Sequence, residues 1–377
     1  MKILLINNFY YNRGGDCTYL FSLKNLLEEK GHKVIIFSMN HPQNFYSEYS
    51  PYFISYINYA EEAKNKNIYS GIKVLLRSIY CVEAKKNIGR LIKDTKPDLV
   101  HLNNIRHHIT PSILRPLKKH NIPVVWTLHD YQLICPNISF VAGGRICEKC
   151  KKRKYFWPIF ARCKKNSFLA SAMAAIEHSV QMITKSYDLV DVFICPSIFL
   201  KNKFIEYGFQ SEKLTLLNHF INVDCDCEDE PLGDYLLYVG RLSEEKGLKT
   251  LIDAVIKLNS CNLKIVGDGP LREELILYAK RTNSTNRIEF LGHKNHEEVR
   301  SLLKDCKFVV LPSEWYENIP FAILEAFACG KPVIGSRIGG IPEFIKENET
   351  GITFKPWNSN ELSLKIDFLM KNPDKIK

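Results

Sequence analysis

Two glutamates, Glu317 and Glu325, lie in a stretch that is otherwise almost wholly apolar, 314-EWYENIPFAILEAFACGKP-332. Pro320 suits the first turn of a helix, so the pattern predicts a buried helix with Glu317 at its entrance and Glu325 inside it. A buried carboxylate is costly unless it is paired, and no Lys or Arg lies within a turn of Glu325. Both carboxylates are therefore expected to face a pocket and to accept hydrogen bonds from hydroxyl groups of a ligand.

Cations and glycines occur in the same half of the chain. Arg241 and Lys246 lie on the loop that follows the predicted strand YLLYVGR, and two cations near helix-terminal N–H groups can bind a diphosphate. Solvated side chains on a surface loop are the alternative. Gly339 and Gly340, in GSRIGGIPEF, either let the backbone approach a ligand closely or form a structural turn.

Four cysteines in the first half of the chain have the spacing C-x11-C-x2-C-x12-C. They are Cys135, Cys147, Cys150 and Cys163. This spacing fits a structural zinc ion held by four thiolates, which would stabilise a long loop with little apolar content. A loop with incidental thiols is the alternative.

A basic segment overlaps these cysteines, 149-KCKKRKYFWPIFARCKK-165. Its eight cations are interleaved with Tyr155, Phe156, Trp157 and Phe160. Cations beside aromatic side chains favour peripheral contact with an anionic membrane. The same composition would suit single-stranded nucleic acid, or a basic loop that is only solvated.

The bulk composition bounds the elements that can position these residues. A chain of 377 residues with 45% hydrophobic and 25% charged residues indicates about two globular domains. No window approaches the run of about 18 apolar residues that a membrane span needs. The N-terminal MKILLINN is typical of a first strand rather than a signal peptide, so a cytoplasmic protein is expected, with thiols or metal ligands rather than disulfides.

Short β-branched runs alternate with longer amphipathic segments along the whole chain, which predicts βαβ units and parallel sheets. The predicted strands are KILLINN (2–8), KVIIFS (33–38), DLVHLNN (98–104), PVVWTLHD (123–130), VFICPS (192–197), YLLYVGR (235–241), LKIVGDG (263–269), IEFLG (288–292), FVVLPS (308–313), KPVIGS (331–336) and ITFK (352–355). His129 ends the fourth of these strands, at the edge where ligand-binding residues of a parallel sheet lie, although a lone histidine there is more often structural.

An acidic, turn-rich stretch at 224–234 separates two halves of opposite charge. Residues 1–220 contain 31 Lys and Arg against 16 Asp and Glu, a net charge of +15, whereas residues 221–377 contain 21 against 25, a net charge of −4. We place the domain boundary between residues 215 and 216 and expect a ligand cleft between the carboxyl ends of the two sheets. Asp224 and Asp226 form a D-x-D pair, but their place in the linker argues against metal binding.

Residues 235–356 resemble the donor domain of retaining GT-B glycosyltransferases of family 4. The resemblance lies in YVGRLSEEKGL, IVGDGP, FLG, LPSEWYENIPFAILEAFACGKPV, GGIPEF and the closing GITF, which occur in order at family spacing. It implies a GT-B fold with two doubly wound Rossmann-like domains facing an interdomain cleft. The acceptor-side domain would be 1–215, with a Cys-rich basic insertion at 135–165, and the donor domain 216–377.

The resemblance also implies roles for residues of the second half. Glu317 would contact the donor sugar, and Glu325 would bind the ribose hydroxyls of a nucleoside-diphosphate sugar. Arg241 and Lys246 would hold the diphosphate. The segment Gly339, Gly340 and Ile341 would also contact the donor.

In the first half, His129 matches a family histidine that contacts the donor sugar. Gly14 and Gly15 match a family glycine pair whose amides reach the diphosphate or the acceptor. Two departures are visible. Cys17 stands where many members have an acidic residue, and Asn103 stands where related sequences often have a histidine.

The sequence therefore predicts a retaining glycosyltransferase of the hexosyltransferase type in cell-surface polysaccharide biosynthesis. Its acceptor would be a glycan or a polyprenyl-diphosphate-linked saccharide. Catalysis would need no cofactor, because side chains and helix ends neutralise the leaving diphosphate in such enzymes. The alternatives are a sugar-nucleotide epimerase of the same fold and, with less support, a nucleic-acid-binding protein; we expect no nucleic-acid partner.

Overall fold

The computed structural model describes residues 1–62, 68–221, 233–258 and 261–372. The chain forms two compact units, one of Met1–Gly143 with Cys147–Phe220 and the other of Gly144–Ile146 with Ile221–Lys377. The division follows strand β10 (Leu214–Leu216), whereas the boundary predicted from the sequence falls inside that strand. The predicted D-x-D pair, Asp224 and Asp226, lies outside the described residues.

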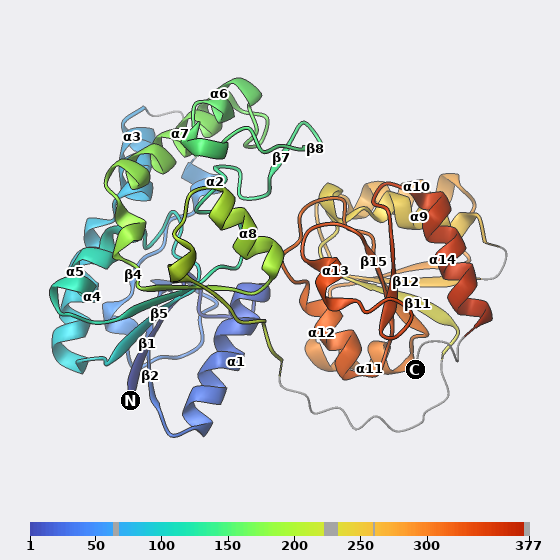
Figure 1. The fold of residues 1–377 in the computed structure, drawn as a ribbon, viewed down its shortest axis with the longest axis horizontal. Helices are drawn as coiled ribbons and strands as arrows, with labels where there is room; N and C mark the ends of the chain where they lie inside the picture. The colour runs from blue at the N-terminus through green and yellow to red at the C-terminus, as the bar shows by residue number, and fades with distance from the viewer. Residues whose placement is uncertain (63–67, 222–232, 259–260, 373–377) are drawn as a thin grey trace. The chain divides into compact units, whose positions relative to one another are not determined.

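The first unit is built on a six-stranded parallel sheet in the order β10-β9-β6-β5-β1-β2 (Figure 1). The remaining strands of this sheet are β1 (Lys2–Ile6), β2 (Lys33–Phe37), β5 (Leu99–Leu102), β6 (Val124–Thr127) and β9 (Val192–Cys195). Each of these five was predicted from its β-branched run. This unit also contains a short parallel pair, β3 (Met39–Asn40) with β4 (Ile54–Ser55). Strand β7 (Val141–Ala142) pairs with β8 (Arg145–Ile146), which the division assigns to the second unit.

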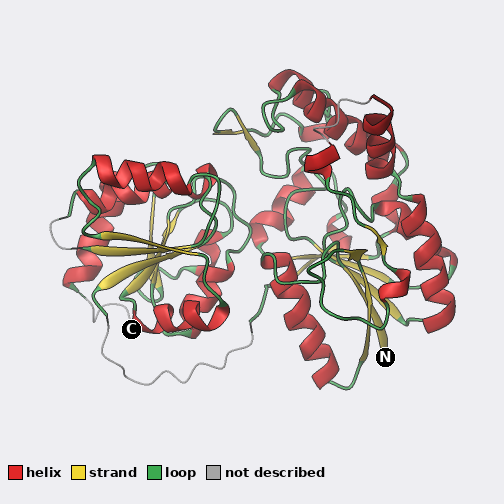
Figure 2. Ribbon diagram, turned by 180° about the vertical axis from the view of Figure 1, so that it is seen from behind, coloured by secondary structure: helices red, strands yellow, loops and turns green. Residues whose placement is uncertain are grey.

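Helices cover both faces of this sheet (Figure 2). They are α1 (Gly15–Glu29), α2 (Tyr59–Glu62), α3 (Ile68–Ile79), α4 (Val82–Thr95), α5 (Leu114–Lys119), α6 (Trp157–Ala161), α7 (Phe168–Ile183) and α8 (Ile198–Glu206). Ser167 caps α7 by accepting a hydrogen bond from the Ala170 amide, and Ser197 caps α8 in the same way.

The second unit contains another six-stranded parallel sheet, in the order β13-β12-β11-β14-β15-β16. Its strands are β11 (Tyr235–Val239), β12 (Asn262–Val266), β13 (Ile288–Gly292), β14 (Phe308–Leu311), β15 (Val333–Ser336) and β16 (Gly351–Phe354). Its helices are α9 (Leu248–Ile256), α10 (Arg272–Arg281), α11 (His296–Asp305), α12 (Phe321–Ala328), α13 (Ile341–Phe344) and α14 (Ser359–Lys371).

Alternate residues of β11 enter two separate cores in the second unit. Leu236 and Tyr238 pack with residues of α9, α10 and α14 on one face of the sheet. Tyr235 and Leu237 pack with residues of α11, α12 and α13 on the other face. A parallel sheet that is buried on both faces needs apolar residues at successive positions, which explains the continuous run YLLYV.

Both sheets reverse their strand order once. In the first unit the reversal lies between β1 and β5, and in the second it lies between β11 and β14. Doubly wound sheets bind ligands beyond the carboxyl ends of the strands at such a switch point. The loops after β1, β5, β11 and β14 are therefore the places to look for functional side chains.

None of the described helices is both long enough and apolar enough to span a membrane.

Candidate functional site

Glu317 is the centre of a polar cluster on the loop after β14. Its Oε1 atom accepts hydrogen bonds from Lys246 Nζ, from Ser313 Oγ at 2.9 Å and from Trp315 Nε1 at 2.7 Å. The glutamate is 8% exposed, so the carboxylate is largely withdrawn from water. Three donors on one buried oxygen fix the direction of the carboxylate.

Lys246 reaches Glu317 because its loop is held tightly against the end of β14. Gly247 follows with φ +67, and a Cβ atom there would lie 2.0 Å from the Pro312 carbonyl oxygen. The Glu314 amide also donates to the Glu245 carbonyl at 2.8 Å. Only glycine permits this approach, so the sequence EEKG places the lysine ammonium at the switch point.

The predicted glycine pair packs against the backbone of Glu317. Gly339 has φ +62, and a Cβ atom there would lie 2.4 Å from the Glu317 carbonyl oxygen. The Gly340 amide donates to the same carbonyl at 2.8 Å, and the Ile341 amide donates to Ile338 at 3.3 Å. The side chain of Ile341 is fully buried. The pair therefore supports Glu317, and the amides of Gly340 and Ile341 are already engaged.

Arg241 lies at the carboxyl end of β11 and is exposed. Its backbone is fixed, because the Tyr238 hydroxyl donates to the Arg241 carbonyl at 2.9 Å. The loop after β12 closes over the preceding residue, since a Cβ atom at Gly267 would lie 1.9 Å from the Gly240 carbonyl oxygen. Within the described ranges, the guanidinium of Arg241 makes no hydrogen bond or ion pair, which leaves it free for an anion.

Glu325 lies on α12 and is half-buried. The residues of this helix that are fully buried are Ala322, Ile323 and Ala326, so one side faces the core and the other is partly open. Burial raises the pKa of Glu325, and nearby His296 opposes this shift. The carboxylate makes no hydrogen bond or ion pair with any residue that the structure describes. Helix α12 is thus less enclosed than its sequence predicts. Among the described residues, no side chain serves as the partner of Glu325.

His129 lies beyond β6 in the first unit and is half-buried. Its Nε2 is 2.9 Å from Asn103 Oδ1, and its ring stacks on His219 with centroids 5.1 Å apart. Burial lowers the pKa of His129 well below its usual value, and His219 and His101 add to that effect. The imidazole is therefore neutral at pH 7, and the Asn103 oxygen orients it where related sequences often have a second histidine.

Gly14 and Gly15 lie at the start of α1 and are exposed. Within the described residues their amides make no hydrogen bond, as is usual in the first turn of a helix. Asp16 follows in the same turn, and burial raises its pKa. Cys17 is fully buried and points into the core, so it does not replace the acidic residue that related sequences have there.

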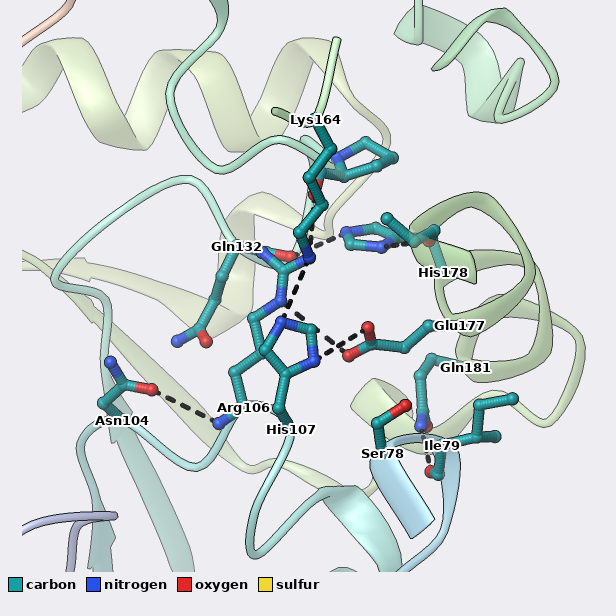
Figure 3. A network of polar contacts seen from close by, with 12 residues as sticks. Ser78, Ile79, Asn104, Arg106, His107, Gln132, Lys164, Glu177, His178 and Gln181 are labelled. Carbon is teal, nitrogen blue, oxygen red and sulfur yellow. Dashed lines mark hydrogen bonds and ion pairs between the residues drawn. The ribbon is translucent and has the colours of Figure 1, made fainter. Parts of the chain in front are cut away.

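A network of ionisable side chains connects the loop after β5 with α7 (Figure 3). His107 Nδ1 is 3.1 Å from Glu177 Oε2, and its Nε2 is 3.2 Å from Lys164 Nζ. Arg106 Nε approaches Glu177 to 3.8 Å, with both side chains nearly buried. Burial alone would raise the pKa of Glu177, but His107 and Arg106 lower it to about 2. The network therefore contains a permanently ionised carboxylate that ties the two elements together.

Aromatic and histidine rings form a continuous wall beside this network. The five rings belong to the segments that follow β1, β3, β4 and β5, namely Phe9 and Tyr11, His41, Tyr56, and His108. The Tyr11 and His41 rings stack with centroids 4.7 Å apart, and Tyr56 and His108 stack at 6.2 Å. Flat rings at the carboxyl edge of a sheet provide a surface for a sugar ring.

The four cysteines of the predicted zinc site are reduced thiols. Cys135 and Cys150 are buried, whereas Cys147 and Cys163 are half-buried. Burial raises the pKa of Cys150, and the other three thiols are close enough to contribute. Among the described residues, however, no three His, Cys, Asp or Glu side chains are arranged to hold a metal ion. Four thiols are suitable ligands for zinc, but their positions in the structure do not form a metal site. Zinc binding therefore stays a prediction.

Several of these residues were not anticipated from the sequence. Ser313 and Trp315 precede Glu317 by four and two positions, but nothing in this spacing indicates that they donate hydrogen bonds to it. His219 follows strand β10, and its ring stacks on that of His129, 90 positions earlier in the chain. The run RHH at 106–108 was a usable signal, because charged residues directly after a buried parallel strand lie at the ligand edge.

Comparisons with known proteins cover both units. The model of "Glycosyltransferase Family 4" matches residues 13–224, and that of "Glycosyl transferases group 1" matches residues 231–377. An uncharacterized 42.6 kDa protein in the cps region of Klebsiella pneumoniae is 29% identical over 365 residues, 91% of this chain and 87% of that protein.

Solved structures share the two-unit fold. Sucrose-phosphate synthase from Thermosynechococcus elongatus has a TM-score of 0.71 at 20% identity, over 99% of this chain and 90% of that one. Anabaena HepE in complex with UDP has a TM-score of 0.62 at 18% identity, over 100% and 91%. These neighbours establish a GT-B fold with two Rossmann-like units. The family model spans more than half of the chain, which is therefore a member of glycosyltransferase family 4.

Proposed function

We propose that this glycosyltransferase moves a sugar from a nucleoside-diphosphate donor to a glycan or polyprenyl-diphosphate-linked acceptor, with retention at the anomeric carbon. The observation that carries the proposal is the ion pair between half-buried Lys246 and buried Glu317 at the switch point of the second sheet. In the same unit, Arg241 and Glu325 have no hydrogen-bond or ion-pair partner for their side chains among the described residues. The neighbour HepE binds UDP, which supports a nucleotide donor.

The donor roles follow from the chemistry of each group. The Glu325 carboxylate has no hydrogen-bond or ion-pair partner in the described part of the chain, so it can accept hydrogen bonds from the two hydroxyls of a ribose. Arg241 offers a free guanidinium, which binds phosphate oxygens with two parallel hydrogen bonds. Lys246 has three N–H donors, one used by Glu317, so the others remain for the diphosphate. Glu317 then lies beside the sugar, with Gly339, Gly340 and Ile341 supporting it.

The reaction breaks the bond between the sugar C1 and the diphosphate oxygen and forms a bond from C1 to an acceptor oxygen. Retention follows if the acceptor attacks from the face that the diphosphate leaves. The leaving phosphate oxygen then takes the acceptor proton, so no enzyme nucleophile is needed. Arg241 and Lys246 stabilise the negative charge that develops on the diphosphate, which is the main catalytic contribution in this scheme.

The first unit is proposed to serve the acceptor and the sugar. The amides of Gly14 and Gly15 have no hydrogen-bond partner among the described residues and lie at the start of a helix, where they suit a phosphate or an acceptor hydroxyl. The neutral imidazole of His129 uses its one N–H, at Nε2, to donate to Asn103 Oδ1, so its Nδ1 can accept one hydrogen bond from a sugar hydroxyl. The ring wall of Phe9, Tyr11, His41, Tyr56 and His108 offers stacking for an acceptor sugar.

The proposed setting is cell-surface polysaccharide biosynthesis, with peripheral contact at an anionic membrane. The relative from a Klebsiella pneumoniae cps region supports the first part. Net positive charge confined to residues 1–220 supports the second, since anionic lipid attracts basic surfaces.

Product analysis tests this function. UDP-, GDP-, ADP- and dTDP-linked sugars are each incubated with a polyprenyl-diphosphate-linked saccharide, and the product is analysed by mass spectrometry and by NMR of the anomeric proton. We expect one donor to be consumed only with acceptor and its configuration to be retained. Conversion of the donor to an epimer without acceptor would favour the epimerase alternative. Neither conversion nor transfer with any donor would contradict the proposal.

A further inference from the structure

The helices α6 and α7 of the first unit expose apolar side chains that the proposed chemistry does not use. Leu169, Ile176 and Ile183 are 69%, 45% and 80% exposed, respectively. They are seven positions apart along α7, and this spacing places all three on one side of the helix. The opposite side of α7 is buried through Ala174, Ala175 and His178 among others. This apolar stripe therefore points away from the core of its own unit.

Exposed aromatic rings also occur on the neighbouring helix and at the start of α7. Phe156 and Phe160 are 50% and 74% exposed, at the start and within α6, and Phe168 begins α7 with 59% exposed. The two helices pack against each other at the edge of the first unit (Figure 1). We call the six side chains Phe156, Phe160, Phe168, Leu169, Ile176 and Ile183 the α6–α7 apolar surface.

Lysines form a hollow beside the aromatic part of this surface. A shallow depression of about 340 Å³ is lined by Lys149, Lys151, Lys152, Lys154 and Trp157. Lys149 Nζ is 5.3 Å from the Trp157 ring centroid, and Lys151 is paired with Glu206 at 3.0 Å. The hollow therefore carries an excess of positive charge and is wide enough for a phosphate-containing headgroup.

The sequence around both helices has almost no negative charge. Residues 149–185 contain nine Lys and Arg and a single acid, Glu177, which is buried in the network with His107. Arg162, Lys165 and Lys185 are exposed at the ends of the two helices. Glu148 and Glu206 lie beside the lysine hollow, paired with Lys203 and Lys151, so the border is predominantly basic. Apolar side chains with such a border match the interface of an anionic bilayer, where the apolar groups enter the acyl boundary and the cations remain among the headgroups.

We infer that the α6–α7 apolar surface docks on an anionic lipid bilayer, with the lysine hollow binding a lipid phosphate. The aliphatic stripe distinguishes this partner from single-stranded nucleic acid, because bases stack on aromatic rings and not on leucine or isoleucine. The inference deepens the proposed function, since a lipid-linked acceptor is presented at such a surface. It does not depend on which donor sugar is used.

Vesicle sedimentation with the full chain tests this docking. The probes are vesicles of phosphatidylcholine alone and of equal parts phosphatidylcholine and phosphatidylglycerol. We expect binding to the anionic vesicles only, weakening as salt is raised because the basic groups are screened. The triple variant Leu169→Ser/Ile176→Ser/Ile183→Ser should lose at least tenfold in partitioning. Each substitution among Lys149→Gln, Lys152→Gln and Lys154→Gln should cost roughly fivefold.

A matched control separates docking from general surface effects. Leu364 on α14 of the second unit is also 69% exposed, so Leu364→Ser changes the same exposed area elsewhere. It should leave vesicle binding unchanged. Melting curves and nucleoside-diphosphate binding, measured on every variant, show whether the chain is folded and whether the donor function survives independently of lipid.

Three outcomes would overturn the inference. One is full vesicle binding by the triple variant, and another is an equal loss in Leu364→Ser. The third is a wild-type protein that ignores both vesicles but forms a dimer in light scattering that the triple variant abolishes, since the surface would then bind a second copy. Vesicle binding that fails while donor turnover persists rejects the docking and leaves the proposed function intact.

Discussion

The two units have the same doubly wound architecture but build their ligand edges differently. In the second unit the edge is ionic and tightly paired, with Lys246, Ser313 and Trp315 all donating to Glu317. In the first unit, the loop after β6 carries the neutral imidazole of His129, stacked on His219, and the loop after β1 carries glycine amides that have no hydrogen-bond partner among the described residues. The ionic Glu177 network of this unit lies on the loop after β5 instead. We infer that the cations of the second unit hold the donor diphosphate, whereas the imidazole of His129 and the glycine amides of the first unit bind sugar groups.

Separating the ion pair should produce the largest effect. Lys246→Met or Glu317→Gln alone leaves one group of a nearly buried pair without its partner, which costs about 3 kcal/mol of unfolding free energy. Turnover should fall by about two to three orders of magnitude, as when one stabilising donor is removed from a developing charge. Calorimetry and initial rates measure the two effects.

The double variant Lys246→Met/Glu317→Gln is the control for this experiment. It should recover part of the stability without recovering turnover, because no unpaired charge remains. A double variant as unstable as the sum of the single variants would show that the pair is not coupled and would weaken the comparison between the units.

Acid should destabilise the first unit selectively. Burial lowers the pKa of His101, His178 and His219 from 6.5 to about 4. Between these values the unfolded chain binds protons that the folded unit excludes, so stability falls as pH decreases from about 6.5 towards 4. Each histidine contributes on the order of 1–2 kcal/mol between pH 7 and pH 5.

Hydrogen exchange followed by mass spectrometry resolves this effect by unit. Peptides of the first unit should lose protection at pH 5 relative to pH 7, after correction for the intrinsic exchange rate. The second unit contains only His293 and His296, which are both exposed, so no comparable burial acts on them. Equal loss of protection in both units would contradict the contrast.

Alanine substitutions in the two glycine pairs should have smaller effects on stability, and these effects should differ between the two units. Gly339→Ala places a Cβ atom against the Glu317 backbone at φ +62, which should cost about 1–3 kcal/mol. Gly14 is extended, with φ 179, and a Cβ atom there meets only Asp16 Oδ1 at 3.8 Å. Gly14→Ala should therefore change stability by less than about 1 kcal/mol.

Activity assays on the same variants complete this prediction. If the free amides of the first unit contact substrate, Gly14→Ala should lower turnover although the fold is intact. Melting temperatures and initial rates are measured together. Alanine keeps the amide and adds only a Cβ atom, so a Gly14→Ala protein with wild-type turnover would show that no substrate approaches the Gly14 Cα closely.

The smallest predicted effect concerns the indole of Trp315. Trp315→Phe removes one donor to a charged acceptor, worth about 1.5 kcal/mol. About a tenfold loss of turnover should follow, because Glu317 keeps Lys246 and Ser313. Steady-state kinetics can detect this change, and a loss as large as in Glu317→Gln would mean that the ring itself contacts the substrate.

Much of the fold was predictable because parallel strands buried on both faces must be continuous apolar runs. KILLI and YLLYV were recognised for this reason, whereas β10 was missed because a three-residue strand, Leu-Thr-Leu, carries too little pattern. The helix with Glu325 was predicted to be buried on nearly every face. Its outer side is half-buried instead, because only one face of α12 packs on the sheet.

The candidate site was less predictable, since its contacts join distant parts of the chain. The roles of Glu317 and Lys246 follow from motif spacing, but their direct pairing across 71 positions does not. The same holds for the stacking of His129 on His219, which depends on how the strands are ordered. Tertiary order, rather than local sequence, decides which donors surround a buried carboxylate.

A thermal-shift panel of UDP, GDP, ADP, dTDP and CDP tests the central claim most directly, namely that the second unit binds a nucleotide through Glu325. A ligand at about 100 times its Kd stabilises the folded state by about 2.7 kcal/mol, which raises the melting temperature by several degrees. Glu274→Ala is the matched control, because this exposed glutamate lies in the same unit on α10. We predict that one nucleotide raises the melting temperature of the wild type and of Glu274→Ala, but not of Glu325→Ala. A full shift in Glu325→Ala, or no shift with any nucleotide in the wild type, would contradict the account.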